Sequence, residues 1–297
     1  MFEEAPNKIE DENQLLNNED KQCSKLSKKN KIMILIIISV LLITIITLII
    51  FFSLREQGKK NKRNEGNNRD EGDKGDDISV LPPLVFNSTS GNHTHSIIFM
   101  PGFSNQPENF RNVFINRINF SKKNDTNIII LRSPYINISA TKAKNYSWFD
   151  VYHFPLDEFS DIDLEQLKKS AKILEKVVND EVNILNGNYK KIIVGGHSQG
   201  SMISLYQAYT TNKSYGGVFA FSGILPPCEI KEEKREMKVY MGYGDKDDVI
   251  LPSFINKTIE KIMDFEGFDL HIYKNYTHKI STNFTIDVSK FLDNIIK

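Results

Sequence analysis

Short apolar runs alternate with longer segments of helical periodicity over the C-terminal part of the chain. Six runs rich in β-branched and aromatic residues predict strands, at residues 96–100, 127–131, 191–194, 218–221, 238–243 and 270–273. Between them, apolar residues recur at intervals of three and four and predict helices, at residues 163–182, 200–209, 252–265 and 287–296. Nearly continuous apolar strands separated by helices are typical of a mostly parallel sheet with helices on both faces. The pattern therefore predicts one α/β domain over residues 82–297.

A different pattern lies nearer the N-terminus, where an uncharged apolar run covers residues 32–52. At a helical rise of about 1.5 Å per residue, this run spans roughly 30 Å, the thickness of a bilayer's hydrocarbon core. A cleaved signal peptide has a shorter apolar core and follows a shorter polar segment than this one. We therefore expect a transmembrane helix, with a disordered polar tail at residues 1–31 and a charged flexible linker at residues 53–81.

Charge does not decide the orientation of this helix, because both flanks are basic. The distribution of N-glycosylation sequons on the two sides of the helix does favour one orientation. Of the 20 asparagines from Asn87 to Asn294, 10 begin an N-x-[ST] sequon, the acceptor of N-glycans: Asn87, Asn92, Asn119, Asn124, Asn137, Asn145, Asn212, Asn256, Asn275 and Asn283. None of the nine asparagines from Asn7 to Asn68 begins one.

This contrast predicts a single-pass type II membrane glycoprotein, whose C-terminal domain is lumenal or extracellular. Chance matches in a chain rich in Asn, Ser and Thr are the alternative explanation. One sequon, at Asn275, lies three residues before a histidine to which we assign a catalytic role below. A glycan there would obstruct the site, so we do not expect every sequon to be used.

Composition narrows the function classes. The chain has 38 basic and 38 acidic residues and a net charge of zero, which gives no electrostatic basis for a nucleic-acid partner. Its two cysteines, Cys23 and Cys228, lie in distant parts of the chain and supply neither a disulfide framework nor a cysteine-rich metal site. We expect no metal and no cofactor.

The strongest chemical motif is Gly-His-Ser-Gln-Gly at residues 196–200. The letters G-x-S-x-G alone arise by chance in about one chain in ten of this length and composition. Here, however, they follow a predicted strand and precede a predicted helix, and the flanking glycines permit the tight turn that lifts a serine hydroxyl above a sheet. Ser198 is therefore the predicted nucleophile of a serine hydrolase.

A serine nucleophile needs a histidine base and an acid that orients the histidine, and in the α/β-hydrolase fold they follow in the order serine, acid, histidine. Two histidines follow Ser198. His271 lies within a predicted strand, whereas His278 lies in the turn after it, where catalytic residues are commonly found. We therefore favour His278 as the base. The acid is expected after strand 238–243, where we favour Asp247 among three candidates, Asp245, Asp247 and Asp248.

The tetrahedral intermediate of acyl transfer also needs two backbone N–H donors. One normally belongs to the residue after the nucleophile, here Gln199. The other is expected in the turn Pro101-Gly102-Phe103 after the first predicted strand. Proline has no N–H, so Phe103 is the predicted second donor.

Four blocks of the sequence resemble the phospholipase/carboxylesterase family, which includes the acyl-protein thioesterases and small bacterial carboxylesterases. A strand followed by PGFSN resembles the family's strand followed by HGLGD, and SWFD at residues 147–150 is similar to its SWFD block. GHSQG resembles its GFSQG, and GDKDDVILP with the later histidine resembles its GDxDxxVP and final histidine. The resemblance covers residues 82–297 and implies these roles: Ser198 as nucleophile, Asp247 as acid, His278 as base, and Phe103 and Gln199 as oxyanion donors.

The sequence departs from the family pattern at Pro101, which replaces a histidine, and at an insertion before Pro252. Trp148, the only tryptophan, is interpreted as an aromatic residue of the substrate pocket. The resemblance implies hydrolysis of a lysophospholipid, an acyl thioester or a small carboxylic ester. Two other functions remain open: a catalytically silent binding module that uses the same pocket, and a peptidase, which usually carries an added cap or propeller domain.

Overall fold

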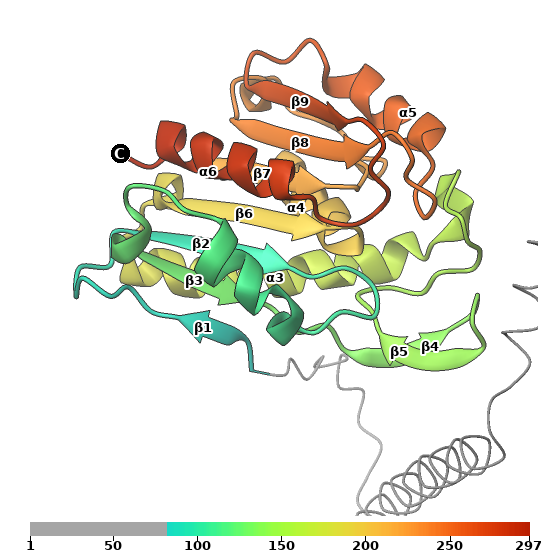
Figure 1. Cartoon of the computed structure of the whole chain (residues 1–297), viewed down its shortest axis with the longest axis horizontal. Coiled ribbons are helices and arrows are strands. Elements are labelled where there is room, and N and C mark those ends of the chain that lie inside the picture. Colours follow the sequence, from blue (N-terminus) through green and yellow to red (C-terminus); the bar gives the residue numbers. More distant parts are fainter. Residues whose placement is uncertain (1–81) are drawn as a thin grey trace, which may run out of the picture. The chain divides into compact units, whose positions relative to one another are not determined.

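The computed structural model describes residues 82–297, in which helices cover both faces of a seven-stranded sheet (Figure 1). The strand order is β1-β3-β2-β6-β7-β8-β9. All neighbours are parallel except β1, which is antiparallel to β3. The bounds are β1 Leu84–Phe86, β2 His95–Met100, β3 Thr126–Ile130, β6 Ile192–His197, β7 Gly217–Phe221, β8 Val239–Gly244 and β9 Phe268–Tyr273. The parallel strands are the six predicted from the sequence, so the predicted α/β class is confirmed.

The central strands β2, β6, β7 and β8 are mostly apolar and almost entirely buried, because both faces of the sheet are covered there. Along β2, Ile97 and Phe99 pack into the hydrophobic core on one face, whereas Ile98 and Met100 pack into the core on the other. Successive side chains of a strand point to opposite faces, so a strand buried on both sides needs apolar residues at every position. Burial on both faces explains why the sequence shows runs rather than alternation.

Three helices, α3 (Leu164–Ile184), α4 (Gln199–Thr210) and α5 (Pro252–Ile262), cover one face. The other face is covered by α6 (Thr282–Ile295), together with a π-helical turn, η2 (Val113–Arg117), and a 3-10 turn, η1 (Pro107–Phe110). The four predicted helices are present. The last one, α6, begins at residue 282 instead of 287, because the Ser281 side chain accepts the Phe284 N–H and caps the helix earlier.

The strand order places the predicted motifs at one edge of the sheet. From β2 the chain goes to β3 on one side, and later returns to β6 on the other side of β2. The loops after β2 and β6 therefore diverge, which leaves a crevice at the carboxyl ends of the strands, where ligands bind in open α/β sheets. The loops after β8 and β9 end at the same edge, since the arrows of these parallel strands point the same way (Figure 1).

A separate two-stranded sheet was not predicted. It pairs β4 (Tyr135–Ile138) with β5 (Ala143–Tyr146) in antiparallel register, and the rings of Tyr135 and Tyr146 lie 4.9 Å apart. Only one of its residues, Ile138, is buried, so the segment shows no apolar run that would mark a strand. The hairpin leads directly into the SWFD block.

The predicted tail, transmembrane helix and linker lie in residues 1–81, outside the described part of the chain. Among residues 82–297, no helix has the length and apolar character needed to cross a membrane.

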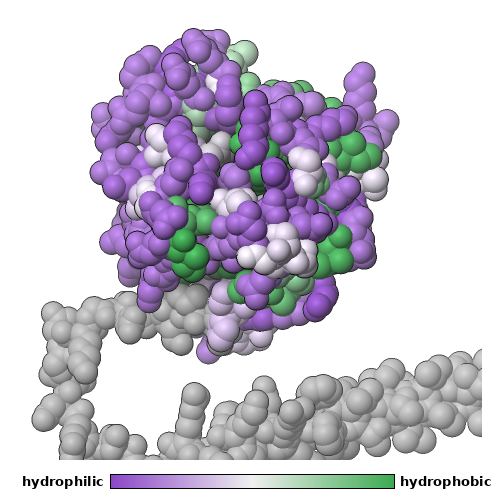
Figure 2. All heavy atoms as spheres, turned by 90° about the vertical axis from the view of Figure 1, so that its left-hand side faces the viewer, coloured by the Kyte–Doolittle hydropathy of each residue, from purple (hydrophilic) through white to green (hydrophobic). Residues whose placement is uncertain are grey.

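Seen from the amino ends of the parallel strands, the surface is mainly hydrophilic, and hydrophobic residues gather only in small separate patches (Figure 2).

Candidate active site

Ser198 lies at a tight turn between β6 and α4, with a φ of 55° and a ψ of −122°. The flanking glycines allow this turn to press against β2. A Cβ atom on Gly200 would lie 1.9 Å from the carbonyl oxygen of Met100, and a Cβ on Gly196 would lie 2.2 Å from the backbone of Gly200. Ser198 donates its backbone N–H to Phe221 at 2.9 Å. The geometry is that of a nucleophile elbow, in which backbone strain supports a functional position.

An acid–histidine pair lies at the same edge of the sheet. Asp247 follows β8, and both of its carboxylate oxygens lie 2.9 Å from Nδ1 of His278, which follows β9. The Asp247 carboxylate also accepts the backbone N–H groups of Val249 and Ile250, at 3.0 and 2.9 Å. Burial raises the pKa of Asp247, but the hydrogen bond and charge of His278 and the two N–H groups outweigh it and hold the pKa below its usual value. The Asp247 carboxylate is therefore ionised, and it holds the His278 ring through Nδ1.

The other two aspartates of this loop have different positions. Asp245 accepts the backbone N–H of Asn275 at 2.6 Å, so its carboxylate ties the loop after β8 to the loop after β9. Asp248 is exposed at the wall of a cavity. Of the three candidates, Asp247 alone contacts His278.

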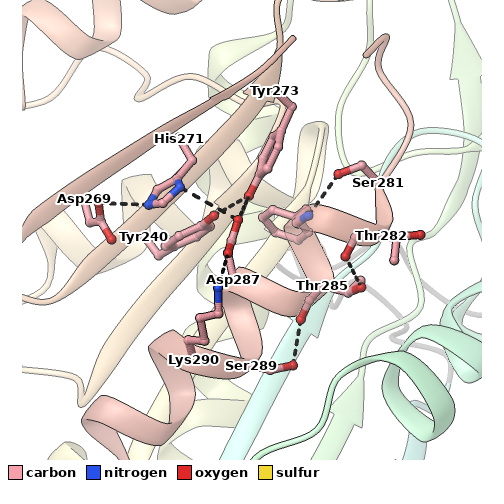
Figure 3. A network of polar contacts seen from close by, with 11 residues as sticks. Tyr240, Asp269, His271, Tyr273, Ser281, Thr282, Thr285, Asp287, Ser289 and Lys290 are labelled. Atoms are coloured by element: carbon pink, nitrogen blue, oxygen red, sulfur yellow. Dashed lines mark hydrogen bonds and ion pairs between the residues drawn. The ribbon is translucent and has the colours of Figure 1, made fainter. Parts of the chain in front are cut away.

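His271, the alternative base, lies away from these residues. It is on β9, where Nε2 is 3.1 Å from Asp269 and Nδ1 is 3.9 Å from Asp287 of α6 (Figure 3). Tyr273 donates to the same Asp287 at 3.0 Å. His271 thus belongs to a polar network that fastens α6 to the edge of the sheet, and it lines neither of the cavities described next.

Two cavities meet at His278. The smaller, of about 180 Å³, contains Ser198 and Gln199 and has mainly apolar walls: Phe103, Val151, Phe154, Leu156 and Val249. The larger, of about 670 Å³, also has a mainly apolar lining, which includes Phe110, Val113 and Ile280. It differs from the smaller cavity in its charged and polar side chains: Asn109, Asp248, Thr277 and Lys279. Val151, Phe154 and Leu156 carry no recognisable motif, and only their place just after the SWFD block marks them in the sequence.

Ser198 and His278 both line the smaller cavity, without a hydrogen bond between their side chains. Because Nδ1 of His278 is engaged by Asp247, Nε2 is the nitrogen that remains for the serine proton. Catalytic hydrogen bonds are often long in a free enzyme and tighten when substrate binds.

The predicted oxyanion donors line the same cavity. Within the described residues, the backbone N–H groups of Phe103 and Gln199 donate no hydrogen bond, so both are free for a ligand oxygen. The Phe103 loop approaches Ser198 closely because residue 102 is glycine: a Cβ atom there would lie 2.9 Å from Cβ of Ser198.

Trp148 lines neither cavity, contrary to its interpretation as a pocket residue. It is 2% exposed, and its indole Nε1–H donates to the carbonyl oxygen of Pro101 at 2.8 Å. The Gln199 side chain accepts from Ser147 Oγ and the Trp148 N–H, and donates to the Phe149 carbonyl oxygen. The SWFD block therefore supports the Ser198 turn through the Gln199 side chain, and the Phe103 loop through Pro101. Its aromatic side chains are buried in the core.

No rival chemistry stands out among residues 82–297. Burial raises the pKa of the Cys228 thiol to about 11, which leaves little of the reactive thiolate at neutral pH. No group of three or more His, Cys, Asp and Glu side chains in this range is placed to hold a metal ion.

Comparison with known proteins finds a matching family model and similar proteins that share one name. Residues 83–296 match the model of the phospholipase/carboxylesterase family. Acyl-protein thioesterase 1 of Debaryomyces hansenii is 27% identical over 179 residues, which cover 58% of this chain and 77% of that protein. Acyl-protein thioesterase 1 of Saccharomyces cerevisiae is 26% identical over 176 residues, 56% of this chain and 77% of that protein.

Solved structures agree in fold. Arabidopsis thaliana SOBER1 matches with a TM-score of 0.62 and 19% identity, over 68% of this chain and 99% of that chain. Zea mays acyl-protein thioesterase 2 matches with a TM-score of 0.57 and 20% identity, over 72% and 99%. The predicted α/β-hydrolase fold and the predicted family are thereby confirmed.

Proposed function

Because the chain belongs to the phospholipase/carboxylesterase family, we propose that it is a serine hydrolase that cleaves carboxylic esters or thioesters through Ser198, His278 and Asp247. The observation that carries this proposal is the hydrogen-bonded Asp247–His278 pair beside the Ser198 elbow, with both histidine and serine lining one cavity. The nearby relatives named acyl-protein thioesterase support hydrolysis of an acyl group.

The proposed reaction has two steps, acylation of Ser198 and hydrolysis of the acyl-enzyme. Ser198 Oγ attacks the acyl carbonyl carbon while Nε2 of His278 takes its proton, and Asp247 stabilises the imidazolium that forms. The N–H groups of Phe103 and Gln199 bind the negative oxygen of the tetrahedral intermediate. When the intermediate collapses, His278 gives the proton to the leaving alcohol or thiol. Water, deprotonated by His278, then attacks acyl-Ser198 and releases the carboxylic acid.

The two cavities suggest how the substrate is divided. The apolar walls and the nucleophile of the smaller cavity suit the acyl chain, whereas the leaving group must lie where His278 can protonate it, towards the larger cavity. A volume of about 180 Å³ is below that of pockets for drug-sized ligands and accommodates about six groups the size of water or methylene. The substrate proposed is therefore a short-chain acyl ester or thioester with a bulky leaving group that has both apolar and polar parts.

This division predicts a chain-length optimum for the purified full-length protein in detergent. On para-nitrophenyl esters, we expect kcat/KM to peak near six acyl carbons, because up to that length each added methylene is buried and contributes about 0.8 kcal/mol. It should fall at least about tenfold by sixteen carbons, because a chain longer than the cavity displaces the acyl carbonyl from Ser198. Phe154→Ala enlarges the cavity and should move the optimum to longer chains. Tyr152→Ala, at an exposed neighbour outside both cavities, is the matched control. An optimum at sixteen carbons in the wild type contradicts the assignment of the small cavity to the acyl chain.

We also propose that the domain lies in a lumen or outside the cell, as the sequon pattern predicts. The observation that supports this is the exposure of nine of the ten sequon asparagines, all except Asn145. Three of the exposed ones, Asn92, Asn124 and Asn212, shortly precede β2, β3 and β7. They therefore lie towards the amino ends of the strands, whose surface is mainly hydrophilic (Figure 2), and glycans there would leave the cavities open.

The expected result is a ladder of glycosylated forms of the full-length protein expressed in a eukaryotic cell, collapsed to one band by peptide N-glycosidase. Replacing Asn92, Asn124 and Asn212 together with glutamine should shorten the ladder by three steps. Asn183→Gln, at an exposed asparagine outside any sequon, should leave the ladder unchanged. A single band that the glycosidase does not shift argues against the lumenal placement.

A further inference from the structure

His197, the residue before the nucleophile, has no part in the chemistry proposed above. It ends β6, is 9% exposed and lines both cavities. Its ring centre is 5.0 Å from that of His278. On its other sides the ring packs against Phe221, at 5.8 Å and nearly parallel, and against Phe110, at 6.1 Å. The side chain is thus fixed by packing directly beside the proposed base.

One hydrogen bond joins the two histidines. Nε2 of His197 lies 2.8 Å from the backbone carbonyl oxygen of His278. A carbonyl oxygen only accepts, so Nε2 carries the hydrogen and donates it. The other ring nitrogen, Nδ1, is buried and has no hydrogen-bond partner among the described residues.

The ring of His197 is neutral. Burial is the main cause, and the neighbouring His278 adds to it: together they lower the pKa of His197 to about 3. In the pH range where a histidine base works, His197 therefore has one N–H group, which is committed to the His278 carbonyl. A cation at this distance would repel the imidazolium that forms on His278 during the reaction, whereas a neutral ring donates without that repulsion.

The loop that carries His278 has its other backbone ties before that residue. The Asn275 N–H and the Tyr276 carbonyl oxygen are both bonded to the loop after β8. At His278 the side chain is held by Asp247 through Nδ1, and the backbone carbonyl by His197. Without the hydrogen bond from His197 to the backbone carbonyl, the imidazole would rotate about the Asp247 carboxylate, and Nε2 would move away from Ser198.

We propose that His197 is a positioning residue for the base: its Nε2–H fixes the His278 backbone, so that the imidazole held by Asp247 presents Nε2 to Ser198. This inference rests on the proposed function, because it assigns His197 a part in the same reaction. A partly buried carbonyl oxygen that loses its donor costs free energy, and the loop is then expected to shift to satisfy it.

Two variants separate the hydrogen bond from the packing. His197→Phe keeps an aromatic ring against Phe110 and Phe221 but has no N–H, whereas His197→Gln places an amide N–H near the position of Nε2. On the best para-nitrophenyl ester, we expect His197→Phe to lower kcat of the full-length protein about tenfold with KM changed less than about twofold. His197→Gln should recover most of kcat. His271→Gln, which removes a histidine outside the cavities, should match the wild type.

A second measurement does not depend on turnover. Amide hydrogen exchange in residues 274–280 should be about tenfold faster in His197→Phe than in the wild type, and near the wild-type rate in His197→Gln. Wild-type kcat and exchange in His197→Phe would overturn the positioning role and leave the hydrolase intact. Equal losses in both His197 variants, with a lowered melting temperature, would show a packing role instead. An inactive wild type overturns the proposed function itself, which none of the variant comparisons does.

Discussion

Replacing Ser198 with alanine is expected to lower kcat on acyl esters by at least about 10⁴-fold, the scale of loss when the nucleophile of a serine hydrolase is removed. The substitution removes one oxygen at a position that is 5% exposed, and it leaves the turn, both flanking glycines and the hydrogen bond from residue 198 N–H to Phe221 in place. The fold has therefore no reason to change, and the loss reports the missing covalent step.

Two measurements check this result on the full-length protein. Steady-state hydrolysis of para-nitrophenyl esters gives kcat, and a fluorophosphonate probe shows whether an activated serine is present. The wild type and Ser253→Ala, at an exposed serine of α5, should both hydrolyse the esters and accept the probe, whereas Ser198→Ala should do neither. If the wild type and Ser198→Ala are equally inactive on oxyesters and thioesters, a binding module that uses the same pocket becomes the better reading.

The parts of the fold that the sequence predicts are those in which burial imposes a period. The six parallel strands and four helices can be recognised because each helix packs apolar side chains into one of the two cores, and the strands contribute apolar side chains to both. The short strand β1 and the β4–β5 hairpin lie at the periphery with few buried residues, so no apolar pattern identifies them. Element ends set by a single cap, such as Ser281 before α6, also escape a reading based on periodicity.

The site, too, has residues that the sequence predicts and contacts that it does not. Ser198 and the glycines around it are recognisable because the elbow tolerates few other residues, and chain order narrows the acid and the base to a few candidates. What the order does not determine is how side chains meet across loops. Trp148 braces Pro101 instead of lining a cavity, and His197 reaches 81 residues along the chain to the His278 carbonyl. These contacts depend on the meeting of β6 with the loop after β9, which no local pattern encodes.

The three aspartates after β8 provide the sharpest test of the proposed triad. Asp247→Asn keeps the size of the side chain but removes the charge, and its amide N–H₂ can donate towards the histidine, which favours the wrong tautomer of His278. Loss of the acid with the geometry preserved lowers kcat about 10⁴-fold in serine proteases, and we expect a loss of that order here. Asp245→Asn and Asp248→Asn, whose carboxylates do not contact His278, should each change kcat by less than about tenfold.

The pH dependence of stability gives an independent readout for the same residue. The folded-state pKa of Asp247 lies below its usual value, so ionised Asp247 stabilises the folded protein at pH values above the unfolded pKa of about 4. That contribution is lost as the pH falls from about 4 through the lower folded-state pKa. In thermal unfolding, the wild type should therefore be more stable than Asp247→Asn at neutral pH, and the gap should narrow below pH 4. A full loss of activity in Asp248→Asn would contradict the assignment of Asp247 as the acid, provided that Asp247→Asn stays active and that its stability gap does not depend on pH.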